Sequence, residues 1–208
     1  MLSLNPRPQR REMRNRLLPS SGAGYDFHRQ FRLLAHRHLS GGENLEALIA
    51  ETRDWGNPHE GRSARAALRL LSRWREDYGG DLHAFEPRGW SSPNDLFRVR
   101  YTPDFGVSID GVRVAVHVWK TQHPPLDARM TYVALALFPD LYGDHARPPQ
   151  DFAVLSLIDG RLYRLSDVGD QDALTATVVA QIERTIRDLS DEIGRRSPEA
   201  PADQPAVF

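Results

Sequence analysis

The sequence predicts a mixed α/β (α+β) fold in which helices precede and flank a central sheet. Between residues 25 and 80, apolar side chains recur every three or four residues, the period of an amphipathic helix. From residue 96 onward the period changes to alternation, which is typical of strands with one buried face. Two Ile-Asp-Gly segments, at 109–111 and 158–160, are typical of tight hairpin turns. We therefore expect helices first and a sheet core after them.

Length and composition indicate one domain with disordered termini. A chain of 208 residues, 40% hydrophobic and 26% charged, is long enough for one well-formed core. We expect a disordered arginine-rich arm over 1–22, a single α/β domain over 23–194 and a disordered Pro- and Ala-rich tail over 195–208. Within the domain, residues 23–80 are expected to be helical and residues 95–194 to form the sheet core with its helices.

Three helices are expected ahead of the sheet, separated by breaks that contain glycine. The first runs from Tyr25 to Leu39, and the apolar stripe of the second lies within residues 45–49. The third begins with Asn57 as its N-cap and Pro58 just inside it, where a missing N–H removes no helical hydrogen bond. Gly79-Gly80 is expected to end it.

Three strands follow a loop that we expect to span residues 81–94. They are predicted over residues 96–101, 105–109 and 112–119. Asp110-Gly111 joins the last two, and both residues tolerate positive φ, so these two strands should be antiparallel neighbours.

The rest of the chain is expected to supply a helix, a second hairpin and a long final helix. Pro124-Pro125 opens a helix whose apolar stripe reaches Leu141. Strands are predicted from Phe152 to Ile158 and from Arg161 to Leu165. The final helix has apolar residues every three or four positions from Leu174 to Ile193, and we expect Gly194 to end it.

Basic charge is concentrated at the amino end, although the net charge is only -1. Residues 1–40 contain eight arginines and two acids. Such an arm can neutralise phosphates, although charge runs more commonly form a solvated, mobile tail without a partner. Trp90, in a proline-flanked loop, is the best candidate for an exposed stacking contact with a base, although a loop tryptophan more commonly fills the edge of a core. The candidate nucleic-acid-binding residues are Arg10, Arg11, Arg14, Arg16 and Trp90.

Several classes of site have no support in the sequence. The chain has no cysteine, so disulfides and cysteine-ligated metals are excluded. There is no phosphate-binding loop or dinucleotide fingerprint, and we expect no nucleotide cofactor. No stretch of roughly 18 apolar residues and no signal peptide is present, so we expect a cytoplasmic protein without a membrane segment. His117 is interpreted as a hydrogen-bonded residue on the sheet face beside Trp119 rather than as a metal ligand.

One basic residue stands apart from the others. Of 27 basic residues 26 are arginine, and the single lysine, Lys120, closes the strand over residues 112–119. Alternation places Lys120 on the same face as Val118 and the valines before it. A buried amine needs an acidic partner or an exit to solvent. Asp104, at the head of the neighbouring strand, is the natural candidate.

Pro103-Asp104 and Val118-Trp119-Lys120, with the predicted element order, resemble the PD-(D/E)XK nuclease superfamily over roughly Ser63 to Leu165. That resemblance implies a helix, three strands, helix, strand core like that of restriction endonucleases, with a mixed sheet flanked by helices. It implies Asp104 and Lys120 as catalytic residues and Asp104 as a ligand of Mg²⁺. Val118 stands where the family has its second acid, so the implied metal site is degenerate.

These observations leave three hypotheses open. The first is a nuclease-fold protein with an incomplete metal site that acts as a nucleic-acid-binding or accessory protein. The second is an active Mg²⁺-dependent nuclease with a relocated acid, for which spacing marks out no candidate among Asp127, Glu76, Glu60 and Glu86. The third is a non-catalytic interaction module that binds a protein partner or a second copy of itself. In a purely structural alternative, Lys120 and Asp104 stabilise the hairpin and do no chemistry.

Overall fold

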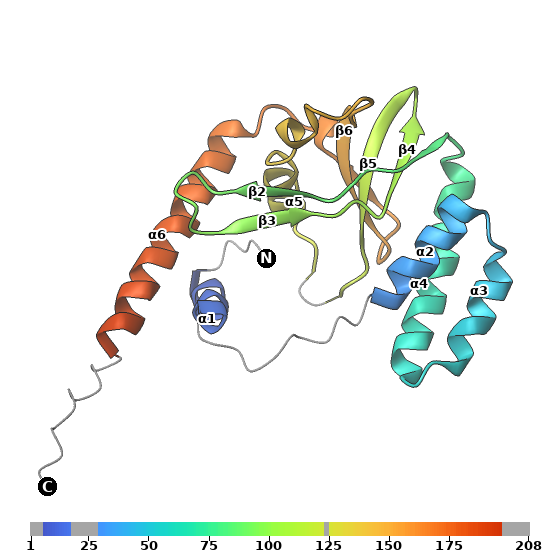
Figure 1. The fold of residues 1–208 in the computed structure, drawn as a ribbon, viewed down its shortest axis with the longest axis horizontal. Helices are drawn as coiled ribbons and strands as arrows, with labels where there is room; N and C mark the ends of the chain where they lie inside the picture. The colour runs from blue at the N-terminus through green and yellow to red at the C-terminus, as the bar shows by residue number, and fades with distance from the viewer. Residues whose placement is uncertain (1–5, 18–28, 123–124, 197–208) are drawn as a thin grey trace, which may run out of the picture.

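The structure, a computed structural model, describes residues 6–17, 29–122 and 125–196 (Figure 1). The helices in this part of the chain are α1 (Pro6–Leu17), α2 (Arg29–Gly41), α3 (Leu45–Glu51), α4 (Pro58–Asp77), α5 (Ala128–Leu135) and α6 (Asp172–Arg196). The strands are β1 (Leu82–His83), β2 (Arg88–Ser91), β3 (Arg98–Tyr101), β4 (Phe105–Ile109), β5 (Val112–Trp119), β6 (Asp151–Ser156) and β7 (Leu162–Arg164). Short 3₁₀ turns lie at Thr52–Asp54, Pro139–Tyr142 and Leu165–Asp167.

The central sheet is mixed and has the strand order β1, β4, β5, β6, β7. β4 pairs antiparallel with β1 and β5, and β6 pairs antiparallel with β7. β5 and β6 are parallel, and α5 lies in the connection between them, as a parallel crossover requires. The predicted fold class is confirmed: helices surround a mixed sheet, and a long helix follows it.

The turn between β4 and β5 has the predicted hairpin geometry. Ile109 lies opposite Val112, and both residues between them have positive φ, 51° at Asp110 and 78° at Gly111. A two-residue turn of this kind matches the twist of the flanking strands. The turn therefore sets the register that places Phe105 opposite Val116 at the other end of the hairpin.

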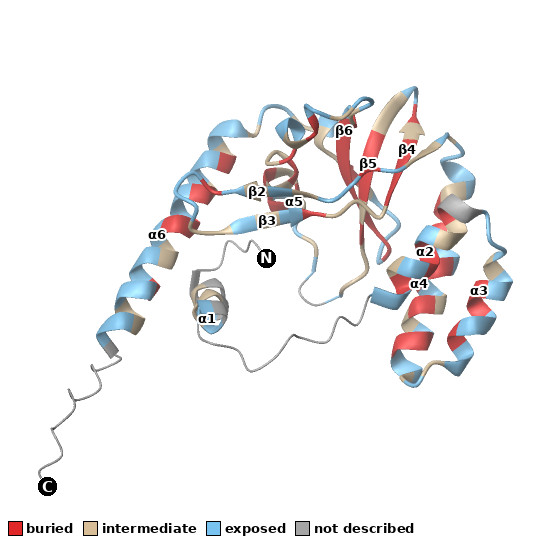
Figure 2. Ribbon diagram, viewed as in Figure 1, coloured by how far each residue is buried: buried red, intermediate tan, exposed pale blue. Residues whose placement is uncertain are grey.

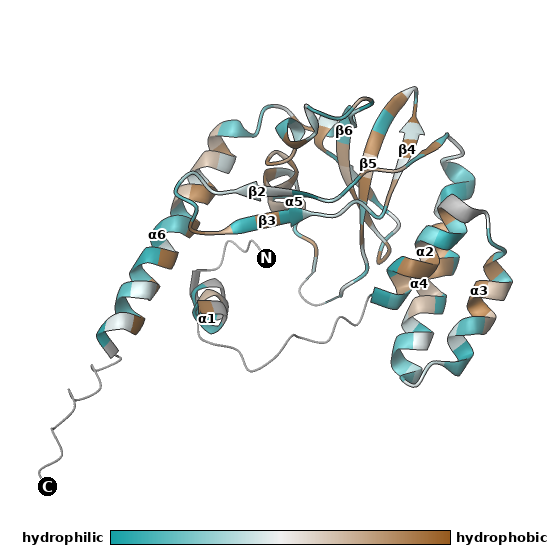
Figure 3. Cartoon of the chain, viewed as in Figure 1, coloured by the Kyte–Doolittle hydropathy of each residue, from teal (hydrophilic) through white to brown (hydrophobic). Residues whose placement is uncertain are grey.

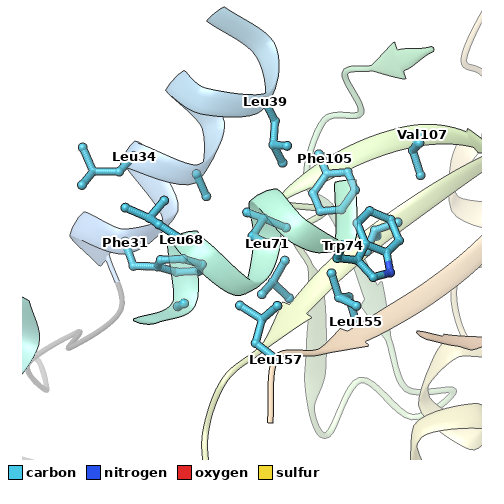
Figure 4. Packing of buried hydrophobic residues seen from close by; sticks show 14 of the residues in the cluster. Phe31, Leu34, Leu39, Leu68, Leu71, Trp74, Phe105, Val107, Leu155 and Leu157 are labelled. Atoms are coloured by element: carbon cyan, nitrogen blue, oxygen red, sulfur yellow. The ribbon is translucent and has the colours of Figure 1, made fainter. Parts of the chain in front are cut away.

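One face of the sheet packs against α2, α3 and α4, and we call it the α2–α4 face. Apolar side chains of α2 and α4 meet alternate residues of β4, β5 and β6 there (Figure 4). Figure 3 shows hydrophobic residues on these helices and strands. Ala64, Leu68 and Leu71 of α4 are fully or almost fully buried in this layer. The β5 residues on this face are Val114, Val116 and Val118.

The opposite face, which we call the α5 face, is covered by α5, the Pro139–Tyr142 turn and the two-stranded β2–β3 ribbon. The ribbon crosses in front of the sheet toward α6 (Figure 1). At its tip the backbone N–H of Asn94 donates to Glu183 of α6 at 2.9 Å. Large buried residues of this layer include Phe85, Tyr101, Phe138, Tyr142 and Phe152.

α6 forms an outer layer beside α5. The Thr175 hydroxyl donates to the Val133 carbonyl at 3.4 Å, and the buried residues of α6 face inward while most others are exposed (Figure 2). α1 packs on α6, where Arg10 pairs with Glu192. No helix in the described ranges is long and apolar enough to cross a bilayer.

The structure corrects the predicted first strand of the sheet. The segment predicted over residues 96–101 forms β3, which pairs with β2 outside the central sheet. The edge position is taken by β1, which the sequence assigned to a loop. With only two residues, β1 has no alternation that a periodicity argument detects. The strand depends on a close approach of Gly80 to β4, because a side chain there would meet the Ser108 carbonyl.

Three helix boundaries also differ from the predictions. α5 ends at Leu135, and Pro139 opens a separate 3₁₀ turn, so the apolar stripe to Leu141 is not one helix. α6 continues through Gly194 to Arg196. Residues 6–17, predicted as part of a disordered arm, form α1. The predicted start of the first helix at Tyr25 and the tail beyond residue 196 lie outside the described residues.

Candidate functional site

Asp104 lies at the base of the β4–β5 hairpin, one residue before β4. Its backbone N–H donates to the Val116 carbonyl at 2.8 Å, which extends the strand pairing by one residue. Its side chain is only 4% exposed, and Oδ2 accepts the Val118 backbone N–H at 2.7 Å. The carboxylate is therefore held against the edge of β5 by a charge-assisted hydrogen bond.

His117 is the side-chain partner of Asp104. The His117 Nδ1 lies 3.0 Å from Asp104 Oδ2 and 3.2 Å from the Thr102 carbonyl oxygen. Both neighbours are acceptors, so Nδ1 carries the proton and the ring is fixed in one orientation. The sequence predicted a hydrogen-bonded His117 on the sheet face, and this is confirmed.

The electrostatics of this pair favour the protonated ring. Burial disfavours the imidazolium, but the hydrogen bond and negative charge of Asp104, with the Thr102 carbonyl, outweigh it and raise the pKa of His117 above 6.5. The positive charge of Arg32, on α2, acts on the same ring in the opposite direction and lowers its pKa. The His117 side chain is 36% exposed, so the ring is accessible from one side.

Lys120 lies at the same end of the sheet but has a different environment. Its Nζ is buried and stands 4.2 Å from the centre of the Phe31 ring, a cation–π geometry. Phe31 belongs to the core of the α2–α4 face, which confirms that Lys120 continues the valine row of β5. Asp104 was expected to pair with Lys120, whereas its carboxylate contacts His117, whose side chain lies on the other side of the strand.

Val118, the position that the resemblance assigns to a second acid, is part of the hydrophobic core. Val118 is 8% exposed and packs within the α2–α4 face. Among the described residues, no group of three or more His, Asp or Glu side chains is arranged to hold a metal ion. Asp104 also uses Oδ2 for the Val118 amide and His117. The described residues thus do not fit the octahedral oxygen shell that Mg²⁺ requires.

The acids considered as relocated ligands are dispersed. Asp127 is the N-cap of α5, where its side chain accepts the Met130 N–H at 2.9 Å. Glu60 is buried, at 2% exposure, in the first turn of α4. Glu76 and Glu86 are exposed, on α4 and in the loop after β1.

The predicted nucleic-acid-binding residues are not all exposed. Arg10 is engaged with Glu192, Arg11 is exposed and Arg14 is half-buried, while the side chain of Arg16 lies outside the description. Trp90 was expected to be an exposed contact. Instead its ring is half-buried, lies 5.7 Å from the Phe97 ring and packs against the core of the α5 face. A loop tryptophan thus seals the edge of a core.

A second buried carboxylate, which the sequence analysis did not single out, lies at the start of β6. Asp151 has a side chain only 3% exposed and accepts hydrogen bonds from Arg164 Nε at 2.8 Å and from the Phe152 N–H at 2.8 Å. The backbone N–H and the hydroxyl of Ser166 complete its shell at 3.1 and 2.6 Å. Both oxygens of the Asp151 carboxylate accept hydrogen bonds, and these bonds fix the end of β7 to β6. We therefore assign Asp151 a structural role.

An open hollow of about 420 Å³ lies at the opposite end of the hairpin from Asp104. It is bounded by the end of α4 and by the β4–β5 turn, including Tyr78, Asp81 and Asp110. None of the residues that bound it belongs to the Asp104 and His117 pair, so we do not place the candidate site there.

Comparisons with known proteins add little to this geometry. No family model matches the chain, and no curated protein matches it. One solved structure, described as "Crystal structure of SSO0001", is similar with a TM-score of 0.35 and 14% sequence identity. The similarity covers 86% of this chain and 82% of that chain, and at this level it says nothing of function.

Proposed function

We propose that this chain is a nucleic-acid-binding protein that resembles PD-(D/E)XK nucleases in fold and does not cleave its ligand. One observation carries the proposal. The aspartate at the position of the first motif is bonded to His117 and to the Val118 amide, and the position of the second acid is a core valine.

The arrangement of elements supports the resemblance. α4 is followed by β1, by the β4–β5 hairpin, by α5 and then by β6, parallel to β5. This is the helix, three strands, helix, strand order that the resemblance implies, with the β2–β3 ribbon inserted after the first strand. Asp104 precedes the second of these sheet strands, and Lys120 follows the third.

The absence of cleavage follows from the chemistry of the side chains. A phosphodiester is cleaved in such folds with Mg²⁺ held by carboxylates, and Val118 has no oxygen to offer. A single carboxylate is also a weak site for such an ion, which is usually held by one or two carboxylates together with substrate phosphate oxygens and water. We therefore assign Asp104 to positioning His117 and propose no metal-dependent step.

The distribution of basic residues favours nucleic acid as the ligand. Arg98 and Arg100 lie on the exposed side of the β2–β3 ribbon, where they face Ser91 and Gly89 across the two strands. Arg11 of α1 is also exposed. Arginine forms bidentate contacts with phosphates. The lack of cysteine is compatible with a reducing compartment, and we include a cytoplasmic location in the proposal.

The proposal is tested by incubating the full chain with single-stranded DNA, duplex DNA and RNA in Mg²⁺ and in Mn²⁺. We expect salt-sensitive retention of nucleic acid and no cleavage. Cleavage that disappears in Asp104→Ala and Lys120→Ala would instead establish a nuclease with a relocated acid. Failure to retain any nucleic acid at low salt would leave the interaction module as the remaining hypothesis.

A further inference from the structure

We infer that one face of the β2–β3 ribbon is the docking surface for a single strand of nucleic acid, whose phosphodiester backbone lies against Gly89 and Arg100. We call it the outer face, and it consists of Gly89, Ser91, Arg98 and Arg100. This inference rests on the proposed function and deepens it, because it names the surface that contacts the ligand. The contact is made with phosphates, so it does not read the base sequence.

The ribbon is a rigid platform with one packed face and one open face. Trp90 and Val99 lie opposite each other and pack against the core of the α5 face. The hydroxyl of the buried Tyr101 donates to the Ala115 carbonyl of β5 at 2.8 Å, and the tip at the other end of the ribbon is bonded to Glu183 of α6. The ribbon, which crosses in front of the sheet (Figure 1), is therefore held at both ends and along its inner face.

The outer face combines two basic residues with two small ones. Gly89 lies opposite Arg100, Ser91 lies opposite Arg98, and all four residues are exposed. Both arginines come from β3, and both small residues come from β2. Two guanidinium groups therefore lie along one strand, next to a strand that carries little side-chain bulk.

Gly89 is a glycine that the fold does not require. It lies within β2, its φ is not positive, and a Cβ there would meet nothing within 4 Å. A glycine inside a strand reduces stability, because it loses the most conformational freedom on folding and has no side chain to pack. Glycine in a strand also lets another backbone approach closely. The absence of a side chain opposite Arg100 therefore indicates a ligand that approaches the ribbon at this point.

The charges on the ribbon select an anion. Residues 88–101 contain three arginines and one acid, Asp95. The Arg100 guanidinium makes no ion pair or hydrogen bond with any described residue. The Arg98 guanidinium pairs with Asp95 at 3.2 Å, but both partners are exposed, so another anion can replace the carboxylate at little cost. Guanidinium groups form bidentate hydrogen bonds with phosphate.

The setting of the ribbon favours a single strand over a duplex. Its inner face is packed on the core of the α5 face, so the ribbon does not project as a β-ribbon does when it enters a major groove. A single strand is flexible and can lie flat along the outer face. That face carries no aromatic side chain, so we expect contacts with phosphates rather than stacking on bases.

Equilibrium binding of a labelled oligothymidylate to the full chain tests the inference. Arg100→Gln removes a charge from the outer face, and Arg69→Gln is the matched control, because Arg69 is also exposed but lies on α4. We expect the dissociation constant to rise about fivefold to tenfold in Arg100→Gln and to stay unchanged in Arg69→Gln. The slope of log Kd against log salt should fall by about 0.7 in Arg100→Gln, as expected for the loss of one phosphate contact on a single strand. Equal effects in the two variants would show that only the total charge matters and would overturn the inference.

Gly89→Ala separates binding from folding. The added methyl group should leave the midpoint of thermal unfolding unchanged or raise it, because the position has room for a Cβ and glycine weakens a strand. The same methyl group should raise the dissociation constant about fivefold, because it holds the ligand backbone away from the ribbon. Gly79→Ala, where a Cβ also meets nothing within 4 Å, is the control and should bind like the wild type. A Gly89→Ala protein that binds like this control, or that unfolds at a lower temperature, would contradict the inference.

The failure of this inference differs from the failure of the proposed function. If the wild type binds the oligothymidylate and both Arg100→Gln and Gly89→Ala behave like their controls, the outer face is wrong and the proposed function stands. If the two variants weaken the binding of a duplex and not of the single strand, the occupant is wrong and the proposed function again stands. If the wild type binds neither probe at low salt, both are overturned, and retention of polyglutamate that is lost in Arg100→Gln would then assign the outer face to an acidic protein.

Discussion

Asp104 Oδ2 and His117 Nδ1 lie 3.0 Å apart, with the carboxylate buried and the imidazole partly exposed. The pair joins the residue before β4 to the sixth residue of β5. The next residue of β5, Val118, donates its backbone N–H to the same carboxylate. The proposed resemblance to nucleases would make this aspartate a metal ligand, whereas in the structure it is the partner of a histidine. This contact is the basis of the stability and pH predictions for the site.

The Asp104 and His117 pair predicts that stability depends on pH. Since the pKa of His117 is raised in the folded state, its contribution is fully present below 6.5, the ordinary value, and is lost as pH rises through the folded pKa. We expect the free energy of unfolding of the wild type to exceed that of His117→Gln by an amount that shrinks as pH rises above 6.5. Urea denaturation of both proteins from about pH 5.5 to 8.5 measures this difference. A difference that grows with pH would contradict the assignment.

Replacement of Asp104 predicts a loss of stability without any metal. Asp104→Ala leaves the Val118 N–H and the His117 Nδ1–H without their shared acceptor, and we expect a loss of about 2 kcal/mol. Asp104→Asn should lose less, because an amide oxygen still accepts one bond. Asp95→Asn, which affects an exposed ion pair with Arg98, is the control and should change little. Equal losses in Asp104→Ala and in the control, measured by urea denaturation, would refute the structural role of Asp104.

Much of the fold was predictable because its signals are local. The alternation of β4 and β5, the Asp110-Gly111 turn and the Asn57 N-cap each depend on residues adjacent in sequence, and the structure confirms them. β1 was missed because a two-residue strand has no period of its own. It exists because Gly80 lies close against the strand that becomes its neighbour.

The candidate site was only partly predictable, because its contacts join residues that are distant in the sequence. Alternation placed His117 and Lys120 on opposite faces of β5, and the recorded contacts agree. The partner of Asp104 depends on the register of β4 and β5 near the base of the hairpin. The alternation along β5 does not determine whether the Asp104 carboxylate reaches the Lys120 amine or the His117 imidazole, which lies three residues earlier in the chain. The burial of Trp90 likewise depends on the β2–β3 ribbon folding onto the sheet, which no local signal specifies.

Introducing an acid at position 118 is predicted to destabilise the fold rather than to create a nuclease. Val118→Asp would put a carboxylate into an apolar layer where the valine is 8% exposed, so we expect a loss of several kcal/mol. Val118→Ala is the control for the loss of packing alone and should cost less. Unfolding is measured with and without Mg²⁺. A Val118→Asp protein that regains wild-type stability only with Mg²⁺ would show that the position can complete a metal site.

The close approach of Gly80 to β4 yields a prediction with a neighbouring control. A Cβ at Gly80 would lie 1.7 Å from the Ser108 carbonyl oxygen, whereas a Cβ at Gly79 meets nothing within 4 Å. Gly80→Ala should therefore destabilise the protein by about 2 kcal/mol or more, because the β1 edge must move. Gly79→Ala should leave the free energy of unfolding almost unchanged. Similar thermal unfolding of the two variants would show that β1 is not held in this way.

Removing the Asp151 carboxylate is predicted to lower the free energy of unfolding more than removing an exposed carboxylate nearby. Asp151→Ala would leave Arg164 without its carboxylate and Ser166 without two hydrogen bonds, and we expect a loss of about 3 kcal/mol. Asp167→Ala, in the same turn, removes a single exposed contact with the Arg164 N–H and is the control. Chemical denaturation of both variants measures the contrast. Nucleic-acid binding by the Asp151→Ala protein, under conditions where it is folded, should equal that of the wild type.

The central claim is that the chain binds a nucleic-acid strand and leaves it intact. The most direct measurement is electrophoresis of an end-labelled single strand recovered from its complex with the wild-type protein after incubation with Mg²⁺ and with Mn²⁺. We expect the recovered strand to have its full length in both metals. Shortened strands from the wild type, absent with Asp104→Ala, would contradict it, as would the failure to recover any bound strand at low salt.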